Sequence, residues 1–172
     1  ILIDHHQQPD EAAFDYGISD TQKSSTCEMV YDINNASGYA DRITPEIAEC
    51  IYAGVVADTG SFRFSSTKAS VHSLVADLMN RGLEHMHVHE ALYDNFLENR
   101  LKFTGHVLLN RMQVFYEQNT ALITIPKADL FKYNIKTGDT EGLVNYPLSI
   151  KGIKLAALVI DRDEERKWSF RS

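Results

Sequence analysis

The chain has 172 residues, of which 44% are hydrophobic and 24% are charged, and it carries a net charge of −7. This composition can fill the core of one ordinary domain or of two small ones, and it excludes a disordered chain, a collagen and a coiled coil. No apolar run approaches the roughly 20 residues of a membrane helix, so we expect no membrane partner. The acidic balance argues against binding long duplex nucleic acid but allows a small phosphorylated substrate that is held by a metal ion.

The chain has two cysteines, Cys27 and Cys50. Two are too few for a disulfide framework, and their spacing is not that of a metal-binding knuckle, so the sequence predicts a reducing, cytoplasmic location. The chain opens at Ile1 within one strand pattern and stops at Ser172 within another. We therefore expect a fragment of a longer protein.

The first predicted element is a short buried strand at residues 1–3, which delivers Asp4, His5 and His6 at its carboxyl end. Ligands collect at this end of the strands in α/β sheets. Adjacent strand residues point to opposite faces, so the two histidines cannot both bind one ion unless the strand ends there. We expect one ligand and one partner; the alternative is a capping aspartate beside two half-exposed histidines.

Three helices follow. Ser25 and Glu28 form a capping-box pattern for a helix that ends near residue 37, and Thr44 with Pro45 starts a second helix. The third is predicted over residues 68–81. The second helix is almost entirely apolar and ends at Asp58, whose carboxylate needs a cation or several hydrogen-bond donors. The alternative is that Asp58 caps the next segment and Gly60 only terminates the helix.

Other candidate residues are weaker. His85, His87 and His89 are spaced so that only the first and the last share a helical face, which favours a solvated helix start over a metal site. Arg63 and Arg171 are isolated cations that could bind phosphate through a planar fork, although a surface role is usual for a lone arginine.

The spacing of the apolar residues changes after residue 111, and from there we expect strands that alternate with short helices. We expect helical segments at 84–111, 127–133 and 140–150, the last capped by Asp139 or Thr140, strands at 113–116 and 121–125, and a hairpin of residues 154–161 and 167–170 that turns around Glu164. The predicted division is a helix-rich α/β part at 1–97, a helical connector at 98–112 and a small α+β part at 113–172.

Three stretches together resemble the DHH phosphoesterases, and within them the oligoribonuclease and phosphoadenosine-phosphate phosphatase branch. These stretches are Asp4-His5-His6, residues 24–31 and residues 54–62; residues 138–145 and the ending 169–172 are similar to the associated substrate-binding domain. The resemblance implies a partial parallel-sheet DHH domain joined to a partial α+β domain.

The same resemblance implies the chemistry. Family members hydrolyse phosphoesters with two manganese ions, with magnesium as the alternative, that activate a bridging water. Asp4, His5, His6 and Asp58 correspond to catalytic groups, with His6 and Asp58 as metal ligands and Asp4 and His5 as supporting groups. His5 and Arg171 correspond to groups that contact the substrate phosphate. The remaining ligands and a glycine-rich motif of the family are absent, so the fragment alone is expected to be inactive.

The favoured substrates are short RNA and 3′-phosphoadenosine 5′-phosphate. Alternatives within the same chemistry are cyclic dinucleotides or their linear products, and polyphosphate. An alternative from another class is a non-catalytic nucleotide-binding regulatory module, against which the joint presence of Asp4, His5, His6 and Asp58 argues. The resemblance also leaves a homodimer open.

Overall fold

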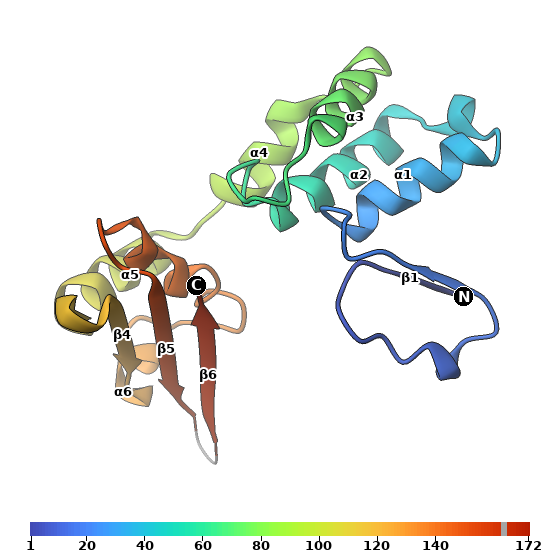
Figure 1. Cartoon of the computed structure of the whole chain (residues 1–172). Coiled ribbons are helices and arrows are strands. Elements are labelled where there is room, and N and C mark those ends of the chain that lie inside the picture. The colour runs from blue at the N-terminus through green and yellow to red at the C-terminus, as the bar shows by residue number, and fades with distance from the viewer. Residues whose placement is uncertain (163–164) are drawn as a thin grey trace. The chain divides into compact units, whose positions relative to one another are not determined.

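A computed structural model describes residues 1–162 and 165–172, and the chain forms two compact units, Ile1–Asn95 and Phe96–Ser172 (Figure 1). Both combine helices with strands, so the mixed α/β class that the sequence predicts is confirmed. Within the described residues, no helix is long and apolar enough to cross a membrane.

Unit 1 opens with a parallel pair of three-residue strands, β1 (Leu2–Asp4) and β2 (Gly17–Ser19). The segment between them contains a short 3₁₀ helix, η1 (Glu11–Ala13). β1 is half-buried rather than buried as predicted, because its sheet has only two strands in the described part of the chain. β2 has no strand signature in the sequence and was not predicted.

The two helices that follow start where the sequence predicts. In α1 (Thr26–Ala36), the Ser25 hydroxyl accepts a hydrogen bond from the Glu28 amide at 3.0 Å. The Glu28 carboxylate returns to the amide and hydroxyl of Ser24, each at 2.7 Å, and not to the Ser25 amide as in a standard capping box. In α2 (Pro45–Asp58), Thr44 caps the helix through the Ile47 amide at 3.4 Å.

The core of unit 1 is helical. A short 3₁₀ turn, η2 (Ala40–Arg42), leads into α2, and α3 (Ala69–Asn80) and α4 (His85–Tyr93) follow it. The apolar faces of these helices pack together, which places α2 at the centre of the unit. Its main contributors are Ala48, Ile51, Val55 and Val56 of α2, Val71, Leu74 and Leu78 of α3 and Val88 of α4.

Unit 2 is built on a four-stranded sheet in the order β3-β4-β5-β6. Its strands are β3 (Met112–Phe115), β4 (Thr120–Ile125), β5 (Leu155–Asp161) and β6 (Arg166–Arg171), with a 3₁₀ turn, η3 (Tyr116–Gln118), between the first two. β4 and β5 run parallel and the outer pairs antiparallel. The hairpin predicted near the carboxyl end is confirmed by β5 and β6, although Glu164 lies outside the described residues.

The helices of unit 2 share one core with the sheet. α5 (Glu98–Asn110) contributes Phe103 and Val107, which are completely buried against Ile123 of β4 and Leu158 of β5. The segment that the sequence analysis assigned to a separate connector is thus part of the hydrophobic core of unit 2. α6 (Lys127–Lys132) completes the connection after β4.

One predicted helical segment differs in its extent and in its N-cap. Residues 140–150 do not form an α-helix capped by Asp139 or Thr140; the structure has a 3₁₀ helix, η4 (Leu143–Ser149), that begins after Gly142. Gly142 has a φ of +81°, a left-handed conformation that interrupts a right-handed helix. Pro147 lies within η4 and has no amide hydrogen to donate, which disfavours regular α-helical bonding.

Candidate active site

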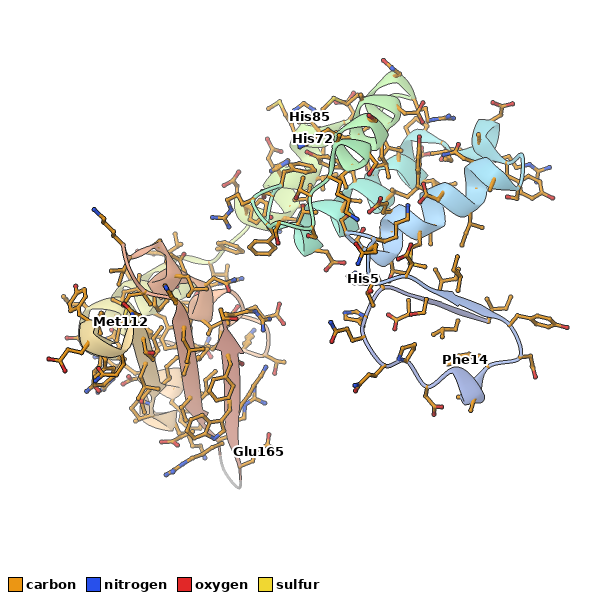
Figure 2. All side chains as sticks on the ribbon, in the orientation of Figure 1. His5, Phe14, His72, His85, Met112 and Glu165 are labelled. Atoms are coloured by element: carbon orange, nitrogen blue, oxygen red, sulfur yellow. The ribbon has the colours of Figure 1, made fainter. Side chains whose placement is uncertain are left out.

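The end of β1 places His5 beside Asp58. The strand ends at Asp4, so His5 and His6 are not constrained to opposite faces of a sheet. His5 Nε2 lies 3.5 Å from Asp58 Oδ2, at the last residue of α2. Figure 2 shows His5 where the two-stranded sheet meets the helices of unit 1. A nitrogen and an oxygen donor from distant parts of the chain therefore converge.

His6 has a different partner. Its Nδ1 lies 2.7 Å from Asp4 Oδ1, and its amide donates to the same oxygen at 3.2 Å. The side-chain hydrogen bond is the main reason that the pKa of the Asp4 carboxyl is lowered. The His6 side chain is 75% exposed, whereas that of His5 is 16% exposed. The resemblance implied His6 as the metal ligand that accompanies Asp58. The structure places His5 beside Asp58 and His6 beside Asp4, and which histidine binds a metal stays a prediction.

Asp58 owes its position to the way in which α2 ends. The amide of Ser61 donates to the carbonyl of Val56 at 2.8 Å, and the amide of Gly60 donates to that of Ala57 at 3.3 Å. These are the two hydrogen bonds of a Schellman motif, with Gly60 as its left-handed residue at a φ of +57°. Gly60 therefore terminates the helix, and Asp58 becomes its last residue.

The chain remains left-handed for two residues after Gly60. Ser61 has a φ of +57° and Phe62 a φ of +66°, a conformation that is uncommon for residues with a side chain and needs support from its surroundings. Thr59 supplies part of this support, because its buried hydroxyl donates to the Val55 carbonyl at 2.6 Å and accepts from the Phe62 amide at 3.0 Å. We call residues 58–63 the Asp58 turn.

Aromatic side chains hold the outer part of the Asp58 turn. The hydroxyls of Ser61 and Tyr93 are hydrogen-bonded at 2.9 Å. The Phe62 ring contacts the rings of Tyr52 and His72, with centroid distances of 6.2 and 5.4 Å. Thr59 and Tyr93 were not among the site residues that the sequence predicts. The short Asp-Thr-Gly sequence marks Thr59, but nothing local in the sequence links Tyr93 to it.

The histidines of α4 have other roles. His89 Nε2 lies 2.9 Å from the Tyr52 hydroxyl. The His85 ring packs edge-on against the His89 ring, with 6.5 Å between the ring centroids. Across residues 1–162 and 165–172, no three His, Cys, Asp or Glu side chains lie close enough together to hold a metal ion. Within the described residues, a metal ion at this site could therefore take two ligands, His5 and Asp58.

Unit 2 holds a cavity of about 360 Å³ beside β6. Its apolar lining includes Leu158 and Ile160, and Lys167 and Arg171 bring two cationic side chains to it. Arg171 Nη1 donates to the carbonyl of Phe170 at 2.9 Å, and within the described part of the chain the other guanidinium nitrogens have no hydrogen-bond partner. The residues around Gly142 that carry part of the family resemblance line the same cavity.

Comparison with known proteins identifies relatives. The chain is 29% identical over 171 residues to the bifunctional oligoribonuclease and PAP phosphatase NrnA of Bacillus subtilis, covering 99% of this chain and 53% of that protein. It is 27% identical to the NrnA of Thermus thermophilus, over 100% of this chain and 50% of that one. An exopolyphosphatase-related protein from Bacteroides fragilis has a similar crystal structure, with a TM-score of 0.93 and 35% identity over 99% of this chain and 50% of that one.

The chain thus spans about half the length of the relatives that it matches. Residues 1–55, which contain β1 and most of α2, match the DHH family, N-terminal domain. The chain is thus similar to the DHH family over residues 1–55 and to the NrnA proteins over nearly all of its length.

Proposed function

We propose that the protein carrying this chain is a manganese-dependent phosphoesterase that hydrolyses short oligoribonucleotides, 3′-phosphoadenosine 5′-phosphate, or both. The observation that carries the proposal is the convergence of His5 and Asp58 at 3.5 Å, in a chain related to bifunctional oligoribonuclease and PAP phosphatases over nearly its whole length. A paired imidazole and carboxylate are donors suited to manganese, and magnesium would favour the carboxylate.

The donors of this chain fit part of such a centre. His5 and Asp58 would hold one ion, and water, substrate or further protein side chains would complete its coordination. The bound metal would acidify a water and stabilise charge on the phosphoryl oxygens. The exposed imidazole of His6, oriented by Asp4, is placed to donate a hydrogen bond to a phosphate oxygen or to the leaving group. Asp4 thereby fixes which ring nitrogen of His6 faces away from it.

The cavity of unit 2 supports the same class of substrate. Arg171 and Lys167 would bind a phosphate group, and the apolar surface of Leu158 and Ile160 would contact a nucleobase or ribose. The cavity volume of about 360 Å³ is at the lower end of the range for small-molecule sites, as expected for a nucleotide and not for a long polymer.

The test is hydrolysis by the protein that carries this chain. We expect Mn²⁺-dependent release of mononucleotides from di- to pentaribonucleotides and of phosphate from 3′-phosphoadenosine 5′-phosphate. Asp58→Asn should lower turnover by more than about 100-fold, with an unchanged thermal unfolding profile. Asp94→Asn, which changes an exposed aspartate at the end of α4, is the matched control and should behave like the wild type.

A second candidate is hydrolysis of polyphosphate, which the name of the similar Bacteroides fragilis protein favours. Polyphosphate offers phosphates but no base, so the apolar part of the unit 2 cavity would have no partner. Preferential cleavage of polyphosphate over both nucleotide substrates would replace the first proposal with this one. Tight nucleotide binding without turnover of any of these substrates would instead identify a regulatory module.

A further inference from the structure

Arg63 is the last residue of the Asp58 turn, and its side chain folds back onto that turn. Its Nε donates to the carbonyl of Gly60 at 2.8 Å, and its amide donates to the carbonyl of Thr59 at 3.0 Å. Gly60 is two residues from Asp58. With a spacing of about 3.8 Å between successive Cα atoms, the guanidinium is thus held within roughly 13 Å of the Asp58 backbone.

The rest of the Arg63 guanidinium is free to bind a ligand. Among residues 1–162 and 165–172, neither Nη1 nor Nη2 has a hydrogen-bond or ion-pair partner, and the residue is exposed. The Nε bond nevertheless fixes the direction of the group. An arginine that is oriented through Nε presents its two terminal nitrogens as a planar fork, which is the geometry that binds two phosphate oxygens at once.

The backbone conformation of the Asp58 turn determines where Arg63 lies. Ser61 and Phe62 adopt left-handed conformations at some cost, and the bonds of Thr59 and the packing of Phe62 maintain them. A helix that only needed to end would require left-handed backbone at Gly60 alone. After the two further left-handed residues, the Arg63 amide returns to within 3.0 Å of the carbonyl of Thr59, the residue next to Asp58.

We propose that Arg63 is a substrate-binding residue of unit 1 that grips a phosphate group of the substrate whose scissile phosphoryl group lies at His5 and Asp58. This inference rests on the proposed function and adds a cationic group beside the acidic and imidazole side chains of Asp4, His5, His6 and Asp58. The bound group is a phosphate monoester or diester, and a substrate with a second phosphate gains most from the contact. Arg63 would contribute to binding more than to the chemical step.

The experiment compares Arg63→Gln, Arg63→Lys and Arg42→Gln in the protein that carries this chain. Arg42 is also an exposed arginine of unit 1, but it precedes α2 whereas Arg63 follows it, so the 14-residue helix separates the two. Steady-state kinetics are measured on 3′-phosphoadenosine 5′-phosphate, and its affinity is measured by calorimetry without added metal. Thermal unfolding verifies that each variant folds.

Arg63→Gln should raise both KM and the dissociation constant about 10- to 100-fold, with kcat changed only a few-fold. Arg63→Lys should recover part of the loss, because it restores the charge but not the fork. Arg42→Gln should match the wild type. Equal KM and affinity in Arg63→Gln and wild type would overturn the inference and would mean that Arg63 only closes the turn.

The outcomes also separate this inference from the proposed function. If the wild type binds the nucleotide but hydrolyses neither it nor short oligoribonucleotides, and Arg63→Gln weakens that binding, Arg63 is a phosphate-binding residue and the proposed hydrolysis is wrong. If hydrolysis occurs but does not depend on Arg63, the proposed function stands and this inference fails. If the wild type neither binds nor hydrolyses the nucleotide and also leaves di- to pentaribonucleotides uncleaved, both fail.

Discussion

His5 Nε2 lies 3.5 Å from Asp58 Oδ2, which joins the carboxyl end of β1 to the last residue of α2. The neighbouring His6 is bound to Asp4 and exposed to solvent. Two adjacent histidines therefore occupy different environments, so substituting His5 should have a different effect from substituting His6.

Loss of a residue that hydrogen-bonds to a metal ligand weakens metal binding by roughly 10- to 100-fold. We expect His5→Asn to weaken Mn²⁺ binding by more than this. His6→Asn should stay within that range and should reduce turnover more than metal affinity. Calorimetric or paramagnetic-resonance titration with Mn²⁺ measures the first effect and steady-state kinetics the second. A larger loss of metal affinity in His6→Asn than in His5→Asn would restore the assignment of His6 as the ligand.

Gly54 of α2 allows α1 to pack closely. A Cβ at position 54 would lie 2.2 Å from Cys27 Sγ and 2.9 Å from Cys27 Cβ, so Gly54→Ala forces the helices to shift. We expect this substitution to reduce the free energy of unfolding of unit 1 by about 1–3 kcal/mol. Cys27→Ala in the same chain should recover part of the loss, because it removes the nearer contact.

Gly105 of α5 provides the matched control in urea unfolding followed by circular dichroism. Among the described residues, no atom outside the neighbouring backbone of α5 lies within 4 Å of a Cβ built there, and its helical backbone suits alanine. Gly105→Ala should therefore stabilise the protein by about 0.5–1 kcal/mol. Equal effects of the two substitutions would contradict the close helix contact at Gly54.

Thr59 should stabilise the Asp58 turn through its hydroxyl. Thr59→Val keeps the shape of the side chain but leaves the Phe62 amide without its acceptor, so we expect a loss of about 1–3 kcal/mol in the free energy of unfolding. Thr59→Ser keeps the hydroxyl and should lose about 1 kcal/mol through the missing methyl group. Denaturant unfolding of the two variants tests the order, and a Val variant as stable as the Ser variant would be inconsistent with this role.

Asp129 makes unit 2 sensitive to acid. Its buried carboxylate binds Arg111 through two hydrogen bonds of 2.6 and 3.1 Å and binds His106 Nε2 at 3.0 Å. The hydrogen bonds from Arg111 are the main cause that lowers the pKa of the Asp129 carboxyl. A lowered folded-state pKa stabilises the fold above the unfolded-state value, and this contribution is lost as the pH falls through the folded-state pKa.

Unit 2 should consequently lose stability below about pH 4. In Asp129→Asn, the free energy of unfolding should depend less strongly on pH in this acidic range. At pH 7 we expect the substitution to cost about 2–4 kcal/mol, because it leaves Arg111 without its charged partner. The only tryptophan of the chain, Trp168, lies in β6 and reports on unit 2 by fluorescence in urea titrations at several pH values. Parallel pH profiles for wild type and variant would show that Asp129 does not titrate in this way.

Local sequence signals were sufficient for the helix ends. Ser25, Thr44 and Gly60 act on backbone groups within a few residues of themselves, so their patterns predict where α1 and α2 begin and where α2 ends. The short stretches that carry the family resemblance contain Asp4, His5, His6 and Asp58, and their roles in a site stay a prediction.

Tertiary structure alone decided how those residues pair. Which of two adjacent imidazoles faces Asp58 depends on the direction in which the chain leaves β1, and no pattern within those few residues contains that information. The same holds for α5, whose Phe103 and Val107 become core residues only because β4 and β5 lie against them. Local hydrogen bonds are set by neighbours in sequence, whereas pairings between distant segments are set by the packing of the whole unit.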